Sequence, residues 1–252
     1  MASMPKEVFD MQGKTAFITG GTGGIGEALV RSLAAAGASV GFIYRRNEAK
    51  AQELEKELSR ENLLVRGFRA DLGNYEEIAA AIVSGASLFG GYDYLVNNAG
   101  ILGEHTLILD IEVEDWYRVL QTNLTAPYLV TKCILPYMTG RSGAAMVNVS
   151  SLAGKNGGTM GVHYAASKAG LLGFTFHLAR ELQPLSIRVN AVAPGPVDTP
   201  MLSEEDRQRL RALSPNGRIA TPEEIARGIL FLLTHEYING EVLDINGGRL
   251  MD

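Results

Sequence analysis

Thr19-Gly20-Gly21-Thr22-Gly23-Gly24-Ile25-Gly26 is a glycine-rich segment that joins a predicted strand to a predicted helix. The apolar run Thr15–Thr19 before it is typical of a buried strand, and the pattern of Gly24–Ala36 after it is helical. Glycines at such a junction let the backbone turn tightly, and the N–H groups of the first helical turn stay free to bind an anion. The spacing fits both GxGxxG and TGxxxGxG, and it predicts a dinucleotide-binding loop.

The rest of the chain alternates short apolar runs with longer helical patterns, as expected of βαβ units. Further strands are predicted at Val40–Tyr44, Leu63–Ala70, Tyr94–Asn97, Ala145–Ser150, Ile187–Val192 and Val242–Ile245. Further helices are predicted at Glu48–Glu61, Tyr75–Phe89, Val113–Met138, Tyr164–Leu182 and Pro222–Leu233. The pattern predicts one α/β domain over residues 1–252, a Rossmann-like doubly wound parallel sheet of about seven strands with helices on both faces; residues 1–10 are expected to be flexible.

The composition is that of an ordinary globular protein, with 252 residues, 46% of them hydrophobic, and a formal net charge of -5. A negative net charge argues against general electrostatic binding of nucleic acid or of an anionic membrane. Cys133 is the only cysteine, and the four histidines have no metal-ligand spacing, so we expect neither a disulfide nor a structural metal. Since no run of about 18 apolar residues occurs, we expect a cytoplasmic protein.

The end of the second predicted strand bears on the choice of cofactor. The acidic residue that binds the adenosine ribose in many dinucleotide sites is absent there, where Tyr44 stands before Arg45 and Arg46. Two guanidiniums suit a 2′-phosphate, so NADP(H) is favoured over NAD(H), although arginines also leave strands in solvated turns. Asp71, after the third strand, is expected to touch the adenine edge rather than the ribose.

The chain holds two Tyr-x-x-x-Lys pairs, each on one face of a predicted helix. Ser151 lies thirteen residues before Tyr164, at the end of an apolar strand, and Lys168 completes that pair. The matching place for the second pair, Tyr128–Lys132, is Asp115 in a polar helix, so we interpret that pair as packing and surface residues. These surroundings favour Tyr164 and Lys168 as the chemical pair.

The combination resembles the short-chain dehydrogenase/reductase family, in its standard branch, over essentially the whole chain. The matching segments are Thr19–Gly26 for TGxxxGxG, Asn97–Gly100 for NNAG, Asn123 for the helix asparagine, Ser151, Tyr164 and Lys168 for the Ser-Tyr-Lys set, Asn190–Gly195 with Thr199 for the segment that holds the nicotinamide, and Gly217-Arg218, Pro222–Glu224 and Asp244–Gly248 for the C-terminal signatures. Together, in order and at family spacings, these segments are highly specific.

This resemblance implies the residues of the site. As catalytic residues it implies Asn123, Ser151, Tyr164 and Lys168, with Lys168 also holding the nicotinamide ribose and Asn123 binding a water that links Lys168 to solvent. As cofactor-binding residues it implies Gly20, Gly21, Thr22, Gly23, Gly24, Ile25, Gly26, Tyr44, Arg45, Arg46, Asp71, Leu72, Asn98, Ala99, Gly100, Tyr164, Lys168, Pro194, Gly195, Val197 and Thr199.

The chemistry suits these residue types. A phenol with a pKa of about 10 is a poor acid near neutrality, and an ammonium one helical turn away stabilises its phenolate. In the reductive direction a carbonyl carbon takes hydride from the nicotinamide, Tyr164 gives its proton to the oxygen, and Ser151 hydrogen-bonds that oxygen. We therefore predict an enzyme that interconverts a ketone and a secondary alcohol.

Several other functions fit the sequence less well. Gly37–Gly41 fits the GxSxG elbow of hydrolases, but there the helix precedes the serine and the strand follows it. A non-catalytic dinucleotide sensor has no need of all four catalytic residues. An extended-branch epimerase and a divergent enoyl reductase fit the chain length and the Tyr to Lys interval less well.

His163 is interpreted as facing substrate or solvent. Pro194–Arg218 is either a helical flap over the site or a solvated helix.

The substrate is less well defined by the sequence. Asn98–Thr131 and the C-terminal end are similar to 3-oxoacyl-(acyl-carrier-protein) reductases, which implies a β-ketoacyl thioester and an acyl-carrier protein as a partner. The turn Gln183–Ser186 lacks the basic residue expected to contact that carrier, and only Arg141 and Arg180 lie nearby, so a sugar, steroid or small-ketone dehydrogenase remains a rival. Candidate lining residues, which do not decide between these substrates, are His105, Lys155, Asn156, Thr159, Met160 and His163.

A homotetramer is the expected assembly. In this family the helices here predicted at Val113–Met138 and Tyr164–Leu182 pack across a two-fold axis. The second helix carries more apolar side chains than a monomer needs, which agrees. They are Tyr164, Ala165, Leu171, Leu172, Phe174 and Phe176.

Overall fold

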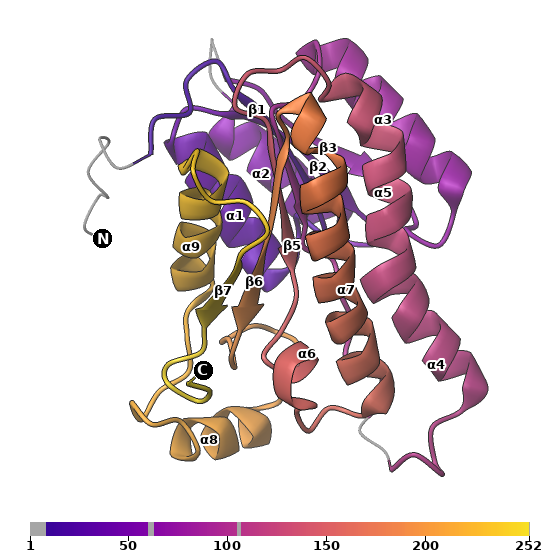
Figure 1. Ribbon diagram of the computed structural model, residues 1–252, viewed down its shortest axis with the longest axis vertical. Coiled ribbons are helices and arrows are strands. Elements are labelled where there is room, and N and C mark those ends of the chain that lie inside the picture. Colours follow the sequence, from indigo (N-terminus) through magenta and orange to yellow (C-terminus); the bar gives the residue numbers. More distant parts are fainter. Residues whose placement is uncertain (1–8, 60–62, 105–106, 252) are drawn as a thin grey trace.

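The computed structural model describes residues 9–59, 63–104 and 107–251. Its seven strands form one parallel sheet in the order β3-β2-β1-β4-β5-β6-β7 (Figure 1). The strands are β1 Thr15–Thr19, β2 Ser39–Tyr44, β3 Val65–Arg69, β4 Tyr94–Asn97, β5 Ala145–Val149, β6 Arg188–Pro194 and β7 Val242–Ile245. This confirms the predicted Rossmann-like parallel sheet.

Helices cover both faces of the sheet (Figure 1). They are α1 Gly24–Ala35, α2 Glu48–Leu58, α3 Tyr75–Phe89, α4 Val113–Leu120, α5 Ala126–Ile134, α6 Ala153–Asn156, α7 Val162–Glu181, α8 Glu204–Ala212 and α9 Pro222–Thr234. One apolar cluster packs α1 and α9 against the sheet, and a second packs α3, α5 and α7 against its other face. None of the described helices is both long and apolar enough to cross a membrane.

The strand order reverses direction between β1 and β4, the neighbours at the centre of the sheet. The chain leaves β1 for the face that carries α1, and it enters β4 from α3 on the opposite face. In doubly wound sheets the loops at the carboxyl ends of these two strands separate and leave a crevice for a ligand. Gly20 and Asn98 are the first residues after those two strands, so both predicted motifs lie at that crevice.

The predicted helix Val113–Met138 is interrupted twice. A π-helical turn, Gln121–Thr125, separates α4 from α5, and a short 3-10 turn, Leu135–Tyr137, follows α5. Pro127 and Pro136 explain both breaks, because a proline has no N–H to give to the carbonyl four residues earlier. The π turn is the more important one, since it contains the predicted catalytic residue Asn123.

Other differences from the predicted elements are small. The third strand is shorter than predicted, and the short helix α6 was not predicted. The predicted α2 end, Glu61, lies outside the described residues, as do residues 1–8 of the segment expected to be flexible.

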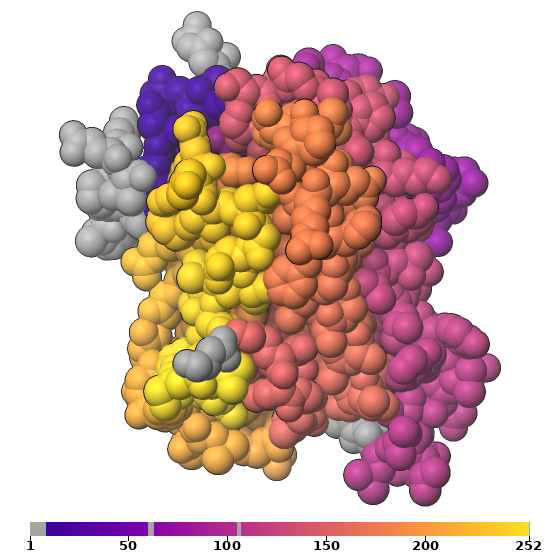
Figure 2. Space-filling model, viewed as in Figure 1, coloured from indigo at the N-terminus to yellow at the C-terminus, as the bar shows by residue number. Residues whose placement is uncertain are grey.

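A helix does form in the irregular stretch after β6. This helix, α8, lies beside the C-terminal part of the chain (Figure 2). The segment after α8 comes close to that part, since a Cβ on Gly247 would lie 3.1 Å from the Asn216 side chain.

The interpretation of the α7 apolar face was wrong for two residues. Leu171 and Leu172 are 1% and 9% exposed, so the chain itself already covers them. The reason is that α7 packs against α4, α6 and the π turn as well as against the sheet. Phe176, at 49% exposure, still points away from the core.

Candidate active site

The backbone of the glycine-rich loop packs so closely that several of its positions admit only glycine. Gly20 has a φ of +72°, which favours glycine, and a Cβ on Gly26 would collide with the Gly20 carbonyl oxygen. A Cβ on Gly24 would lie 2.7 Å from Thr199. Helix α1 follows its N-cap residue Gly23 without any side-chain cap, so its first N–H groups are open to an anion. The loop therefore fits the pyrophosphate of a dinucleotide.

Two basic residues stand where the adenosine end of such a ligand would lie. Arg45 and Arg46 are both exposed and follow the end of β2. The guanidinium of Arg45 pairs with Asp71 across the strand ends, at 2.8 Å. An exposed pair of this kind is worth at most about 1 kcal/mol, so it leaves Arg45 free to exchange partners. The structure thus brings Arg45 and Asp71 together, and the predicted adenine contact of Asp71 stays a prediction.

The segment after β4 is held tightly against the glycine loop. The Thr19 hydroxyl accepts hydrogen bonds from the N–H groups of Asn98 and Ala99, both at 3.0 Å. The Asn98 amide donates to the Thr19 carbonyl oxygen at 2.9 Å. These bonds fix the two sides of the crevice relative to one another.

Gly100 marks the closest approach between this segment and the catalytic helix. A Cβ at Gly100 would lie 3.2 Å from the Lys168 ammonium nitrogen and 3.3 Å from the Asn123 amide oxygen. Two predicted catalytic side chains, from the π turn and from α7, therefore meet at this glycine.

Ser151, Tyr164 and Lys168 converge at the carboxyl end of β5. The Ser151 hydroxyl hydrogen-bonds that of Tyr164, and the Lys168 ammonium lies 5.9 Å from the centre of the Tyr164 ring. Lys168 also donates to the carbonyl oxygen of Val149, at 2.8 Å. A strand end and one helical turn thus deliver the three predicted groups to one place.

The electrostatics of this cluster follow from burial. Burial lowers the pKa of Lys168 from 10.5 to about 8, since the residue is 3% exposed and no carboxylate among the described residues compensates the charge. Burial raises the pKa of Tyr164, and the hydrogen bond from Ser151 opposes that rise. The phenol is therefore protonated near neutrality and able to donate a proton.

Asn123 is fully buried and satisfied by protein groups. Its amide oxygen accepts from the N–H of Ile101 at 2.9 Å, and its amide nitrogen donates to the carbonyl of Ile101 at 2.9 Å and to the Ser167 hydroxyl at 3.0 Å. Asn123 thereby ties the segment after β4 to α7. The implied water-binding role stays a prediction.

The segment after β6 closes another side of the crevice. Gly195 donates its N–H to Ile245 of β7, and Thr199 is 9% exposed against the glycine loop. Arg207 of α8 pairs with Asp198 at 2.7 Å and donates to the Thr199 carbonyl oxygen at 2.9 Å. Helix α8 is therefore anchored to the rim of the site, and the choice between a flap and a solvated helix stays a prediction.

The interpretation of His163 as facing substrate or solvent was wrong. His163 is fully buried, and its Nε2 atom lies 3.2 Å from a carboxylate oxygen of Asp115. Sequence reasoning also missed Ser167, whose hydroxyl donates to the Tyr164 carbonyl at 2.7 Å. The Ser167 bond is a local i to i−3 contact within α7, a pattern open to any helical serine. The His163 contact has no sign in the sequence, because it depends on how α4 packs on α7. Among the other lining candidates, Lys155 pairs with Asp244 at 2.5 Å, and His105 lies outside the described residues.

Two further sequence interpretations agree with the structure. Ser39 is the first residue of β2, and its hydroxyl accepts a hydrogen bond from the N–H of Leu64 at 3.1 Å, so it is no nucleophile elbow. In the second Tyr-x-x-x-Lys pair, Tyr128 and Lys132 are both exposed on α5. Neither feature belongs to the crevice.

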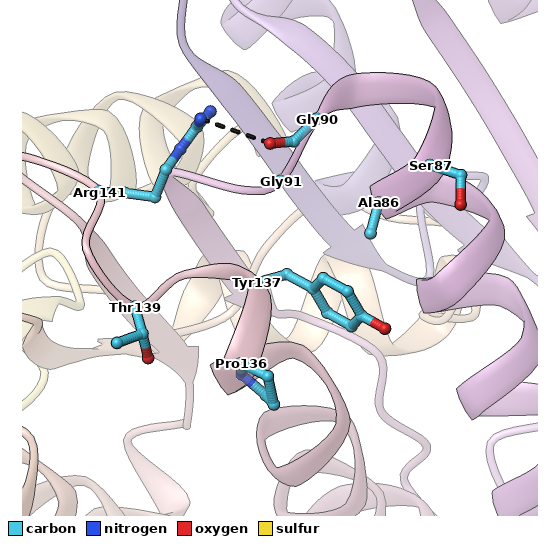
Figure 3. Close-up of a pocket in the computed structure, with 8 residues that line it drawn as sticks. All are labelled: Ala86, Ser87, Gly90, Gly91, Pro136, Tyr137, Thr139 and Arg141. Atoms are coloured by element: carbon cyan, nitrogen blue, oxygen red, sulfur yellow. Dashed lines mark hydrogen bonds between the residues drawn. The ribbon is translucent and has the colours of Figure 1, made fainter.

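A cavity of about 450 Å³ lies at the other end of the sheet (Figure 3). Its walls include Tyr137 and Arg141, and the Arg141 guanidinium pairs with Asp93 at 3.1 Å, just before β4 begins. Since β4 and β5 start there, the cavity is at the amino edge of the strands and is separate from the candidate active site.

Comparisons with known proteins agree with this geometry. A sequence model described as short chain dehydrogenase matches residues 14–210. The 3-oxoacyl-(acyl-carrier-protein) reductase FabG of Aquifex aeolicus (strain VF5) is 41% identical over 246 residues, which cover 94% of this chain and 98% of that protein.

Solved structures are similar over nearly their whole length. A blue fluorescent protein from a metagenomic library, in complex with NADPH, has a TM-score of 0.90 at 33% identity and covers 96% of this chain and 100% of its own. A 3-ketoacyl-(acyl-carrier-protein) reductase from Brucella melitensis, complexed with NADH, has a TM-score of 0.89 at 31% identity, with coverages of 96% and 100%. The chain belongs to the short-chain dehydrogenase family, and it is a dinucleotide-dependent oxidoreductase that acts on CH–OH and C=O groups.

Proposed function

We propose that this enzyme reduces the 3-oxo group of acyl thioesters with NADPH. The observation that carries the proposal is the convergence of Ser151, Tyr164 and Lys168 at one strand end. The choice among carbonyl substrates rests on similarity to proteins named 3-oxoacyl-(acyl-carrier-protein) reductase, two of which are 41% and 37% identical over nearly the full length.

The proposed mechanism uses three side chains of the chain itself. Tyr164 and Ser151 hold the substrate carbonyl oxygen through their hydroxyl groups, which already interact with each other. Tyr164 donates its proton to that oxygen as negative charge develops there, and Lys168 stabilises the phenolate that remains. A bound reduced nicotinamide supplies the hydride. The Lys168 ammonium is held in place by its hydrogen bond to the carbonyl oxygen of Val149.

The substrate class is tested by a screen of NADPH oxidation. Purified enzyme is offered 3-oxoacyl thioesters, keto sugars, keto steroids and simple ketones, and kcat/KM is compared among them. The proposal expects the thioesters to be the best substrates. A clear preference for one of the other three classes would replace it.

The acyl-carrier protein is a separate part of the proposal. The turn after α7 presents Leu185, 40% exposed, where a basic contact is expected, and this observation favours the rival small-ketone substrates. Comparing the same 3-oxoacyl chain on a carrier protein and on a short pantetheine mimic separates the two. A higher kcat/KM on the carrier protein supports a carrier contact, and equal values argue against one.

We infer a preference for NADP(H) from the arginines after β2. Replacing Arg45 and Arg46 together by Ala should weaken NADPH binding at least about tenfold more than NADH binding, because a guanidinium contact with a phosphate is charge-assisted. Fluorescence titration with each cofactor measures both dissociation constants. An equal loss of affinity for NADPH and for NADH would contradict the proposed preference for NADP(H).

We also propose a homotetramer. Large apolar side chains remain exposed on α4, α5 and α7, and a second copy would cover them. They are Val113, Tyr117, Tyr128 and Phe176. Light scattering at micromolar concentration should give four times the mass of the chain, and a monomeric mass would contradict this assembly.

A further inference from the structure

A buried histidine and a buried aspartate meet directly beside the proposed catalytic tyrosine. His163 is 0% exposed and Asp115 is 9% exposed, and the His163 Nε2 atom lies 3.2 Å from one Asp115 carboxylate oxygen. The same oxygen accepts the backbone N–H of Glu104 at 2.9 Å. The other carboxylate oxygen accepts from Arg118. The proposed proton transfer uses none of these groups.

The hydrogen bonds settle which nitrogen of the neutral imidazole carries the proton. His163 Nδ1 accepts the backbone N–H of Tyr164 at 2.9 Å, so it has no proton of its own. Nε2 is then the N–H that donates to Asp115. Burial alone would raise the pKa of Asp115, but the bonds from Glu104, Arg118 and His163 outweigh it and hold that pKa below its usual value. The acceptor is therefore an ionised carboxylate.

The backbone of Tyr164 is held on both sides by this arrangement. Its N–H belongs to the first turn of α7, where no helical carbonyl can accept it, and His163 takes that place. Its carbonyl oxygen accepts from Ser167, which in turn accepts from Asn123 of the π turn. Contacts from α4 and from the π turn thus fix the one residue whose hydroxyl must reach the substrate.

Two glycines pack closely against the His163 imidazole. A Cβ on Gly103 would collide with His163 Nε2, and a Cβ on Gly161 would lie 2.6 Å from its Cε1 atom. Both have positive φ angles, +75° and +91°. The ring therefore joins three segments: the start of α4, the loop after β4, and the first turn of α7.

We propose that His163 and Asp115 are positioning residues that hold the backbone of Tyr164, and with it the phenol, in the geometry for proton transfer. This inference rests on the proposed function of Tyr164 as proton donor. A misplacement of about 1 Å can cost 10²-fold in rate, so the pair acts on kcat without touching substrate.

The chain offers variants that separate the two bonds. His163→Asn keeps an acceptor near the Nδ1 position, and His163→Gln keeps a donor near the Nε2 position, whereas His163→Ala removes both. Thr175→Val is the matched control, because Thr175 is a fully buried residue of α7 whose hydroxyl bonds Asn148 and Leu171, away from the catalytic groups. If His163→Ala does not fold, the Asn and Gln variants carry the test.

Each variant is measured for kcat, KM and NADPH dissociation constant. We expect His163→Ala to lower kcat about tenfold or more, with Asn and Gln in between, and NADPH affinity to stay within about twofold. Thr175→Val should leave kcat within about twofold despite a lower melting temperature. A kcat for His163→Ala within twofold of the unmodified enzyme would overturn the proposal.

His163→Ala in the Tyr164→Phe background separates a failure of the positioning role from a failure of the proposed function. A residue that acts through the phenol has no further effect once the hydroxyl is gone, so His163→Ala should leave the residual turnover unchanged. An equal loss in both backgrounds refutes positioning and leaves the proposed function intact. Full activity of Tyr164→Phe itself would instead refute the proposed function.

Discussion

Tyr164→Phe is expected to lower kcat by at least about 10²-fold and to leave NADPH affinity nearly unchanged. The substitution removes one oxygen atom, and with it the proton donor and the hydrogen bond from Ser151. The ring stays, so the first turn of α7 and its neighbours keep their packing. Initial rates of NADPH oxidation give kcat, and fluorescence quenching gives the dissociation constant.

Tyr128→Phe is the matched control for this prediction. Tyr128 stands in the same four-residue interval before a lysine, yet it is 48% exposed on α5, away from the strand ends. Its substitution should change kcat by less than about twofold, because the change removes one hydroxyl far from the reacting groups and keeps the apolar ring that the proposed tetramer would cover. Equal losses in the two variants, or none in Tyr164→Phe, would contradict the role of Tyr164.

The sheet and the loops at its edge were predictable because both follow from local patterns. Strands β1, β4 and β7 have the predicted ends, since each is an apolar run bounded by polar or glycine residues. Parallel strands bring their carboxyl ends to one edge, and this alone places Ser151 near the glycine loop. The four-residue interval from Tyr164 to Lys168 placed both side chains on one face of α7, because four residues span about one helical turn.

The contacts that were missed depend on packing between elements distant in the sequence. Pro127 marks the break at the π turn, but the bonds between Asn123 and Ile101, 22 residues earlier, have no sign in the helical periodicity. His163 could be placed about 100° around α7 from Tyr164, but which direction is buried depends on where α4 lies. Leu171 was misjudged for the same reason. A helix with partners on three sides cannot be told from one with an open face by its own sequence.

Lys168→Met is the second large effect, and it should change activity and stability in opposite directions. Removing the ammonium withdraws the charge that stabilises the Tyr164 phenolate, so kcat should fall about 10² to 10³-fold. At pH 7 the unfolding free energy should rise by up to about 3 kcal/mol, because about 1.4 kcal/mol corresponds to each pKa unit by which burial depresses the lysine. The lost hydrogen bond to Val149 offsets about 1 kcal/mol of that gain.

The pH dependence tests the origin of this stabilisation. The lysine has a pKa of about 8 when folded and 10.5 when unfolded, so between these values the unfolded chain binds the additional proton and stability rises with pH. That rise belongs to the unmodified enzyme and is absent from Lys168→Met. The advantage of the variant should therefore be full below pH 8 and vanish towards pH 10.5. Denaturant unfolding at pH 7 and pH 10 measures it, with Lys132→Met as the control, since that exposed ammonium is already solvated. A variant less stable than the unmodified enzyme at pH 7 would show that burial of the charge carries no such cost.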